Sequence, residues 1–118
     1  MAGDRDRDRT LALLRDHQLT YVCVDAPPVS ELPSVFAVTT PGLFVMRFHG
    51  RANDTWKGRT RTAAERFRYL YSDDELEQLA NGVAEVAGEA RESHLLMNNC
   101  YRDYGVNNAA RLRELLTP

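Results

Sequence analysis

The chain has 118 residues, of which 43% are hydrophobic, so it can build one small core. Its formal charge of -2 and pI of about 5.9 exclude a global basic field that would attract nucleic acid or anionic membranes. No apolar stretch approaches the roughly 20 residues of a membrane span, and the start of the chain lacks the apolar segment of a signal peptide.

The first half of the sequence predicts one helix and two or three strands. Alternating acids and bases from Asp4 to Arg9 lead into TLALLRDH and predict a first helix. Residues 21–25, YVCVD, are rich in β-branched and aromatic types and predict a strand. Prolines indicate a loop between Ala26 and Pro33, and residues 35–38 fit a brief extra strand. Residues 43–50, LFVMRFHG, give the strongest strand pattern, and a polar loop follows.

The second half predicts a helix, a strand and a final helix. Ser72 precedes Glu75 by three positions, which is a capping-box signature. Apolar residues at helical spacing then predict an amphipathic helix: Leu76, Leu79, Ala80, Val83 and Val86. Residues 93–98, SHLLMN, predict the last strand. A final helix is expected from about Gly105, and its predicted buried side consists of Val106, Ala109, Leu112, Leu115 and Leu116.

This order of elements predicts an α/β fold. Strands separated by helices are typical of parallel sheets with crossover helices. No internal repeat or low-complexity linker divides the sequence, so residues 1–118 are expected to form a single unit. Cys23 and Cys100 lie too far apart for a paired metal or redox motif, and we expect a protein of the reducing cytoplasm.

Polar residues are predicted to gather where the strands end. Side chains alternate between the two faces of a strand, so helices covering Phe44 and Phe48 would leave Arg47 and His49 facing a barrel interior or cleft. Asp25 ends the first strand in the same way. The carboxyl ends of strands hold the ligands of α/β sheets and barrels.

The last strand adds two amides to this set. Asn98 ends the strand and Asn99 begins the loop that follows it. One interpretation is a ligand site that uses these residues and the nearby Arg51: Arg47, His49, Arg51 and Asn98. The alternative is an ion pair between Asp25 and Arg47 that only fills the mouth of a barrel, because a buried charge needs a partner.

The loops beyond the strands hold further candidates for a ligand site. Arg51, Asn53 and Trp56 follow the middle strand, and a guanidinium, an amide and an indole suit a planar or phosphorylated ligand. Trp56 is alternatively a lid or core residue. Arg102 precedes the final helix, whose backbone N–H groups attract anions. Residues 43–71 also carry a local excess of five positive charges, which is equally consistent with a solvated Arg-rich loop.

Signals for catalysis are few. His49 is a candidate general acid or base, and Asp25 would orient it. The sequence contains no nucleophile elbow, no HExxH motif and no Gly-rich phosphate loop. A metal site would need more His and carboxylate ligands than the strand ends supply, so no metal is predicted. The sequence names no cofactor.

Four segments occur in the order found in one known family. They are YVCVDAP, VMRFHGRANDTW, ERFRYLYSDDEL and LLMNNCYRDYGVNNAARL. In these segments the chain resembles the DUF72 (YecE-like) family of TIM-barrel proteins from about Thr10 onward. A TIM barrel has eight strands and about 250 residues. The resemblance therefore implies a partial TIM barrel: the C-terminal half, with three to four parallel strands and crossover helices. A chain that starts at Met1 then fits a truncated or split gene product, or a wrongly assigned start.

An incomplete barrel has consequences for partners and function. Unpaired sheet edges favour self-association or pairing with a chain that carries the N-terminal half-barrel. Three hypotheses of function stay open. They are binding of an anionic or phosphate-bearing ligand at the carboxyl ends of the strands, a phosphodiester hydrolase or nuclease-like enzyme completed by the N-terminal half, and an inactive truncated remnant. Nucleic acid stays an open partner, and no membrane is expected.

Overall fold

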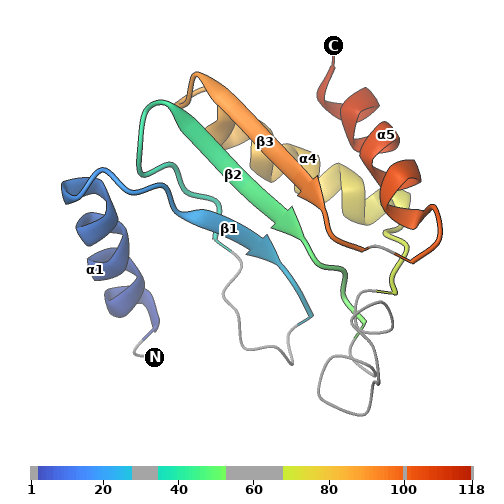
Figure 1. Ribbon diagram of the computed structural model, residues 1–118, viewed down its shortest axis with the longest axis horizontal. Coiled ribbons are helices and arrows are strands. Elements are labelled where there is room, and N and C mark those ends of the chain that lie inside the picture. Colours follow the sequence, from blue (N-terminus) through green and yellow to red (C-terminus); the bar gives the residue numbers. More distant parts are fainter. Residues whose placement is uncertain (1–2, 28–34, 53–67, 100, 118) are drawn as a thin grey trace.

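A computed structural model describes residues 3–27, 35–52, 68–99 and 101–117. The elements follow in the predicted order: α1 (Gly3–Asp16), β1 (Val22–Asp25), β2 (Leu43–Phe48), α4 (Asp73–Ala87), β3 (Glu92–Met97) and α5 (Tyr104–Leu116) (Figure 1). The brief strand considered at residues 35–38 is wrong, because these residues form no strand. No helix of the described residues is long and apolar enough to cross a bilayer.

The strands form one parallel sheet in the order β1-β2-β3. In register, Asp25 lies beside Phe48 and Val24 beside Arg47. Neighbouring residues of a parallel pair share a face of the sheet, so Asp25 lies on the face of Phe48 and Arg47 lies on the opposite face. This register divides the polar residues at the strand ends into two groups.

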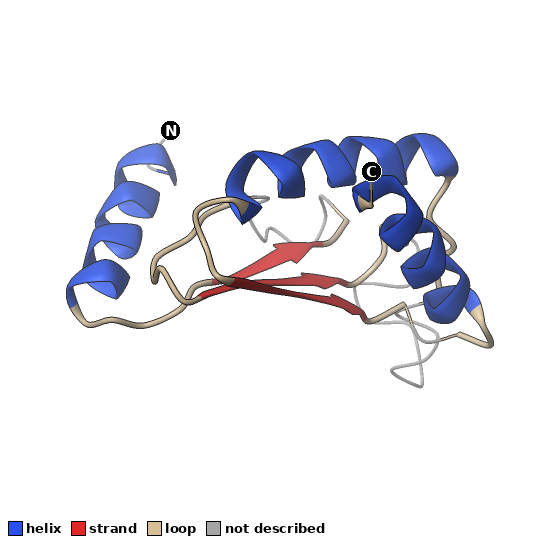
Figure 2. Cartoon of the chain, turned by 90° about the horizontal axis from the view of Figure 1, so that it is seen from above, coloured by secondary structure: helices blue, strands red, loops and turns tan. Residues whose placement is uncertain are grey.

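One face of the sheet is covered by helices. Figure 2 shows α4 and α5 on the same side of the three strands. The core beneath them is built from apolar residues of the sheet, the two helices and the segment before α4: Cys23, Phe44, Met46, Phe48, Tyr71, Leu76, Leu79, Ala80, Val83 and Leu112. Burying one such large side chain contributes about 2 kcal/mol. The apolar stripe predicted for α4 is therefore confirmed.

Helix α4 begins as its sequence predicts. The Ser72 hydroxyl accepts a hydrogen bond from the Glu75 N–H at 3.1 Å, and the Glu75 carboxylate accepts one from the Ser72 N–H at 2.9 Å. This capping box satisfies two N–H groups that the first turn of a helix leaves without a partner. Glu75 is thereby fixed at the end of the sheet where β1 and β2 terminate.

Helix α5 is rotated relative to the prediction. Leu112 is buried, and Leu115 and Leu116 pack against the core as expected. Val106 is 72% exposed, however, and Asn108 is buried in its place. The reason is a pair of hydrogen bonds between the Asn108 amide and the backbone of Tyr71, which turn this side of α5 inward. The prediction that Val106 and Ala109 are buried is therefore wrong for the described residues, because both are exposed.

The other face of the sheet carries no helix among the described residues (Figure 2). Val22 is 42% exposed and Leu96 is 47% exposed on this open face, where Arg47 also lies. Helix α1 lies to one side of the sheet in both views (Figures 1 and 2), with Leu13 exposed.

Candidate functional site

The ends of the three strands lie side by side. Hydrogen bonding continues past the strands, because the His49 N–H donates to the Asp25 carbonyl and the Asn98 N–H donates to the Phe48 carbonyl, each at 2.8 Å. His49 is thus held between the first and third strands, at the end toward which all strands point.

The buried Asp25 forms an ion pair with the partly buried Arg51 on the helix-covered side. The Arg51 guanidinium donates to both carboxylate oxygens of Asp25, from Nε to Oδ2 at 3.0 Å and from Nη2 to Oδ1 at 2.9 Å. The Tyr71 hydroxyl donates to Oδ2 at 2.7 Å. The ion pair considered between Asp25 and Arg47 is not the one that forms, because the register places these two side chains on opposite faces. Bidentate pairs of this kind are among the strongest hydrogen-bonded contacts in proteins.

Glu75 extends this network to helix α4. Its carboxylate accepts from Arg51 Nη1 at 3.2 Å and from the Tyr69 hydroxyl at 2.8 and 2.9 Å. Burial raises the pKa of Glu75, but hydrogen bonds from Ser72 and Tyr69, together with the charge of Arg51, bring it below its ordinary value. Burial and the bond to Glu75 raise the pKa of Tyr69 to about 12, so this hydroxyl stays a donor.

The backbone turn between β2 and this network depends on a glycine. Gly50 has φ of 89°, and its N–H donates to the Tyr71 hydroxyl at 2.8 Å. A β-carbon at this position would lie 2.6 Å from Cβ of Tyr69, so a side chain does not fit without movement. Burial, followed by the charge of Asp25, raises the pKa of Tyr71, which therefore stays protonated as a donor to that carboxylate.

His49 lies on the other side of this turn, beside Asn98. The Asn98 side-chain nitrogen lies 3.1 Å from His49 Nδ1. Burial and the positive charge of Arg47 lower the pKa of His49, and Asp25 offsets this in part. The imidazole is therefore neutral at pH 7, and its Nδ1 accepts from the Asn98 amide. Asp25, in contrast, directs its carboxylate oxygens to Arg51 and Tyr71.

Asn99, a predicted ligand residue, is fully buried. Its amide nitrogen donates at 2.8 Å to the Tyr69 carbonyl and to Oδ1 of Asn108. Asn108 also accepts from the Tyr71 N–H at 2.9 Å and donates to the Tyr71 carbonyl at 3.3 Å. These two asparagines join the segment before α4 to the end of β3 and to α5. Sequence reasoning missed Asn108, although an Asn on the inward side of a helix is the signal that points to such a bond.

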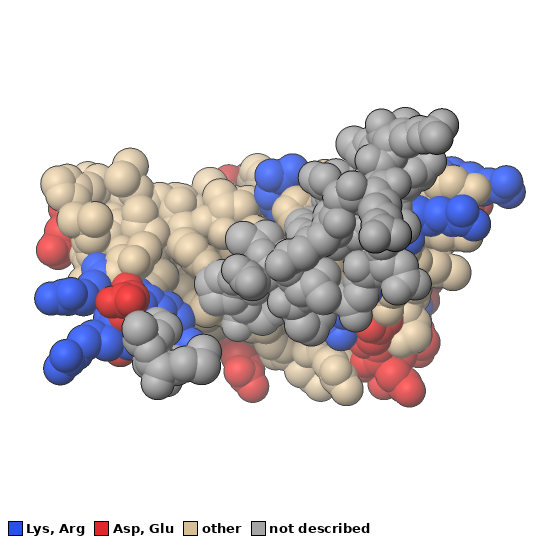
Figure 3. Space-filling view, turned by 90° about the horizontal axis from the view of Figure 1, so that it is seen from below, with Lys and Arg blue, Asp and Glu red and all other residues tan. Residues whose placement is uncertain are grey.

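A groove of about 670 Å³ opens beside Asn98 at the start of α5. Residues of β2, β3 and α5 line it, together with the segment between β3 and α5: Arg47, Leu95, Leu96, Met97, Asn98, Arg102, Gly105, Val106 and Ala109. Three residues predicted from sequence, Arg47, Asn98 and Arg102, thus meet in one groove. Figure 3 shows the molecule from below, with basic side chains toward both ends of this face.

Arg68 is a further cation near this groove that sequence reasoning did not select as a ligand residue. Its guanidinium lies 4.4 Å from the centre of the Tyr101 ring, and that of Arg102 lies 5.4 Å from the same centre. Cation–π contacts of this kind hold guanidinium groups in place without neutralising them. Asn53 and Trp56, also predicted as ligand residues, lie outside the described residues. Within the described part of the chain no three His, Cys, Asp or Glu side chains form a metal cluster.

Comparison with known proteins identifies the family. The model of the family described as "Protein of unknown function DUF72" matches residues 2–118. The chain belongs to the DUF72 family. It is 25% identical to the UPF0759 protein YunF of Bacillus subtilis (strain 168) over 114 residues, which cover 92% of this chain and 40% of YunF.

Two solved DUF72 structures share its fold. A Thermotoga maritima protein superposes with a TM-score of 0.82 at 34% identity, over 92% of this chain and 40% of that protein. An Enterococcus faecalis protein superposes with a TM-score of 0.87 at 27% identity, over 98% of this chain and 43% of that protein. The chain therefore spans less than half the length of these relatives. The α/β partial barrel predicted from sequence is confirmed.

Proposed function

We propose that the groove at the start of α5 binds an anionic, phosphate-bearing ligand. The observation that carries this proposal is the convergence of Arg47, Asn98 and Arg102 from three separate segments. Two guanidinium groups and an amide supply N–H donors that suit phosphate oxygens. The groove is also wide enough for a small molecule.

The charges around the groove support binding of an anion. No ion pair of Arg47 or Arg102 occurs within the described residues, whereas Arg51 is paired with Asp25 and Glu75. The first turn of α5 contains no acidic residue, and Asp103 makes no side-chain hydrogen bond that caps it. The Tyr104 N–H donates to the Tyr101 carbonyl at 3.1 Å, and the positive dipole end of this helix still favours a bound anion.

In this proposal the two sides of the sheet have different roles. Asp25 and Arg51 hold the turn that follows β2, so they act as positioning residues. His49 stays the candidate general base, because its lowered pKa leaves it neutral. Asn98, at 3.1 Å, would orient the imidazole in place of Asp25.

A titration with inorganic phosphate tests the ligand proposal. The full chain is titrated while NMR follows the ring signals of His49, which respond to an anion beside Arg47. We expect Arg47→Ala to weaken phosphate binding tenfold or more, which is about 1.4 kcal/mol. Arg102→Ala should weaken binding in the same direction. Arg15→Ala on α1, an exposed arginine away from the groove, is the matched control and should leave the affinity unchanged. Equal affinities in all three variants would exclude the groove as the binding site.

A further inference from the structure

Two arginines from segments far apart in the sequence contact the same aromatic ring. The guanidinium carbon of Arg68 lies 4.4 Å from the centre of the Tyr101 ring, and that of Arg102 lies 5.4 Å from it. The Tyr101 ring packs edge-on against Tyr104, the first residue of α5, with the ring centres 5.3 Å apart. The two guanidinium groups are therefore neighbours, and the ring that holds them is packed against a helix.

Buried amides fix the segment that carries Arg68. The Asn99 side-chain nitrogen donates to the Tyr69 carbonyl at 2.8 Å, and the Tyr71 N–H donates to Asn108 Oδ1 at 2.9 Å. Both asparagines are buried, whereas the Arg68 side chain is exposed. The backbone beside this exposed cation is thus already ordered, so little of its conformational freedom is lost when a ligand binds.

The backbone of Arg102 points to a use for its side chain. Its φ is 50°, in the left-handed region that glycine and asparagine adopt more readily than arginine does. A position with this backbone favours a small residue, and strain of this kind often accompanies ligand contacts. The Arg102 side chain lines the groove together with Arg47 and Asn98. Arg102 therefore belongs both to the groove and to the arginine pair on Tyr101.

The cations at this end of the sheet exceed what one phosphate neutralises. Within the described part of the chain, the arginines that form ion pairs are Arg51 and Arg111. The guanidinium groups of Arg47, Arg68 and Arg102 therefore keep their charge. A phosphate monoester carries about two negative charges at pH 7. A second phosphoryl group linked to the first would supply the further negative charge.

We propose that the ligand of the groove carries a diphosphate group rather than a single phosphate. Arg47 and Asn98 bind the first phosphoryl group, and Arg68 binds the second. Arg102 lies beside both and donates to each of them. This inference rests on the proposed function, because the first phosphoryl group occupies the phosphate site described there.

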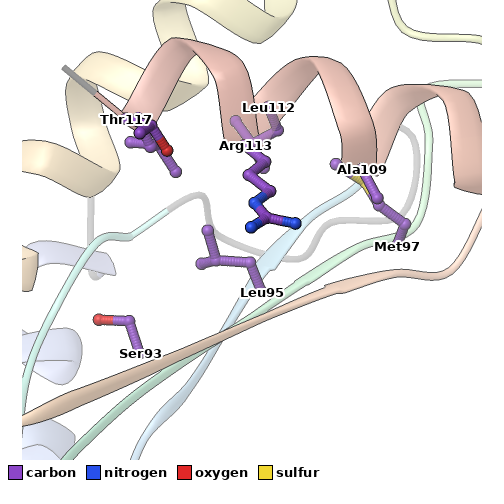
Figure 4. A pocket seen from close by; sticks show the side chains of 8 residues that line it. Ser93, Leu95, Met97, Ala109, Leu112, Arg113 and Thr117 are labelled. Atoms are coloured by element: carbon purple, nitrogen blue, oxygen red, sulfur yellow. The ribbon is translucent and has the colours of Figure 1, made fainter.

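A second groove offers the second phosphoryl group a less suitable place. It has a volume of about 280 Å³, lies between β3 and α5, and contains one cation, Arg113. Figure 4 shows Arg113 and Leu95 pointing toward each other across it. The apolar side chains of Leu95, Met97 and Ala109 line both grooves and so separate Arg113 from the phosphate site. A charged group would lose its hydration along this stretch, so the second phosphoryl group is expected at Arg68.

Titrations of the full chain with inorganic phosphate and with pyrophosphate test this inference, in a buffer without divalent cations. We expect the unaltered chain to bind pyrophosphate about tenfold more tightly than phosphate. Arg68→Gln should remove most of this preference by weakening the binding of pyrophosphate alone. Arg113→Gln, which removes an exposed arginine of the same charge, is the matched control and should leave both affinities unchanged. Arg47→Ala should weaken the binding of both anions.

Variants of Tyr101 test the position of the two cations separately. Tyr101→Phe keeps the aromatic ring and should keep the preference for pyrophosphate. Tyr101→Leu removes the ring and should reduce this preference, in a chain whose circular dichroism shows it folded. Equal preferences in these two variants would contradict the role of the ring in holding the arginine pair.

Three results would overturn the diphosphate inference and leave the phosphate site in place. One is equal affinity of the unaltered chain for phosphate and pyrophosphate. Another is an equal loss of both affinities in Arg68→Gln, which would mean that Arg68 binds the first phosphoryl group. The last is a preference that Arg113→Gln removes and Arg68→Gln retains. If neither anion binds, the proposed function fails as well.

Discussion

A polar cluster lies at the strand ends on each side of the sheet, and the two clusters differ in how many of their polar groups are paired within the protein. On the helix-covered side, Asp25, Arg51, Tyr71 and Glu75 bond to one another. On the open side, Arg47 has no ion pair within the described residues, and it lines a groove with Asn98. A cluster whose members bond to one another stabilises the fold, whereas an unneutralised cation in a groove is equipped to bind a ligand. Position in the sequence does not distinguish a stabilising residue from a ligand-binding one, because Arg47 and Arg51 are close neighbours in the chain.

Removing Asp25 should give the largest loss of stability. Asp25→Ala leaves Nε and Nη2 of the half-buried Arg51 and the buried hydroxyl of Tyr71 without their acceptor. We expect a loss of about 3 kcal/mol in the free energy of unfolding, measured by urea denaturation. Glu114→Ala, which breaks an exposed pair with Arg111, is the control and should change little. A small effect of Asp25→Ala would mean that the covered cluster does not support the fold.

Removing the Asn108 side chain should lower the free energy of unfolding by somewhat less than removing that of Asp25. The Asn108 amide bonds to Asn99 and to both backbone groups of Tyr71. Asn108→Ala leaves buried polar groups without partners, and we expect a loss of about 2 kcal/mol in the free energy of unfolding. Asn107→Ala, at the exposed neighbouring position of α5, should be nearly neutral. Equal effects of the two variants in thermal denaturation would contradict this interpretation.

The titration of His49 should have the smallest effect on the free energy of unfolding among these predictions. The pKa of His49 is lowered in the folded protein, so the unfolded chain binds its proton more readily. Neutral His49 therefore contributes its full share of stability when the pH is above 6.5, the ordinary pKa of histidine. This share is lost as the pH falls from 6.5 through the lower pKa of His49 in the folded protein. His49→Gln should flatten this part of the profile, and Arg47→Ala should make it shallower. Urea denaturation between pH 7.5 and 5, in a buffer free of phosphate, measures this. An unchanged profile in both variants would show that the open-side charge does not act on His49.

Local patterns explain what the sequence predicted correctly. The alternation in LFVMRFHG and the capping box of Ser72 and Glu75 depend on neighbours a few residues apart, so β2 and α4 follow from the sequence. Long-range register does not follow in this way. Whether Asp25 shares a face with Arg47 depends on how β1 pairs with β2, and that pairing directs Asp25 to Arg51 instead.

Helix α5 shows the same limit. Its apolar residues fit more than one inward-facing stripe, and hydrophobic spacing favoured the one that contains Val106. The bonds between Asn108 and Tyr71, 37 positions apart, select the other stripe. A buried amide therefore decides the rotation of this helix.

The most direct test of the division between the two clusters compares Arg47→Ala with Arg51→Ala. For each variant, the affinity for inorganic phosphate and the free energy of unfolding are measured on the same preparation. We predict that Arg47→Ala lowers the affinity tenfold or more with little loss of stability. Arg51→Ala should lower the stability by about 2 kcal/mol and retain phosphate binding while folded. The reverse pattern, or equal effects of both variants on affinity, would contradict the assignment of ligand binding to the open side.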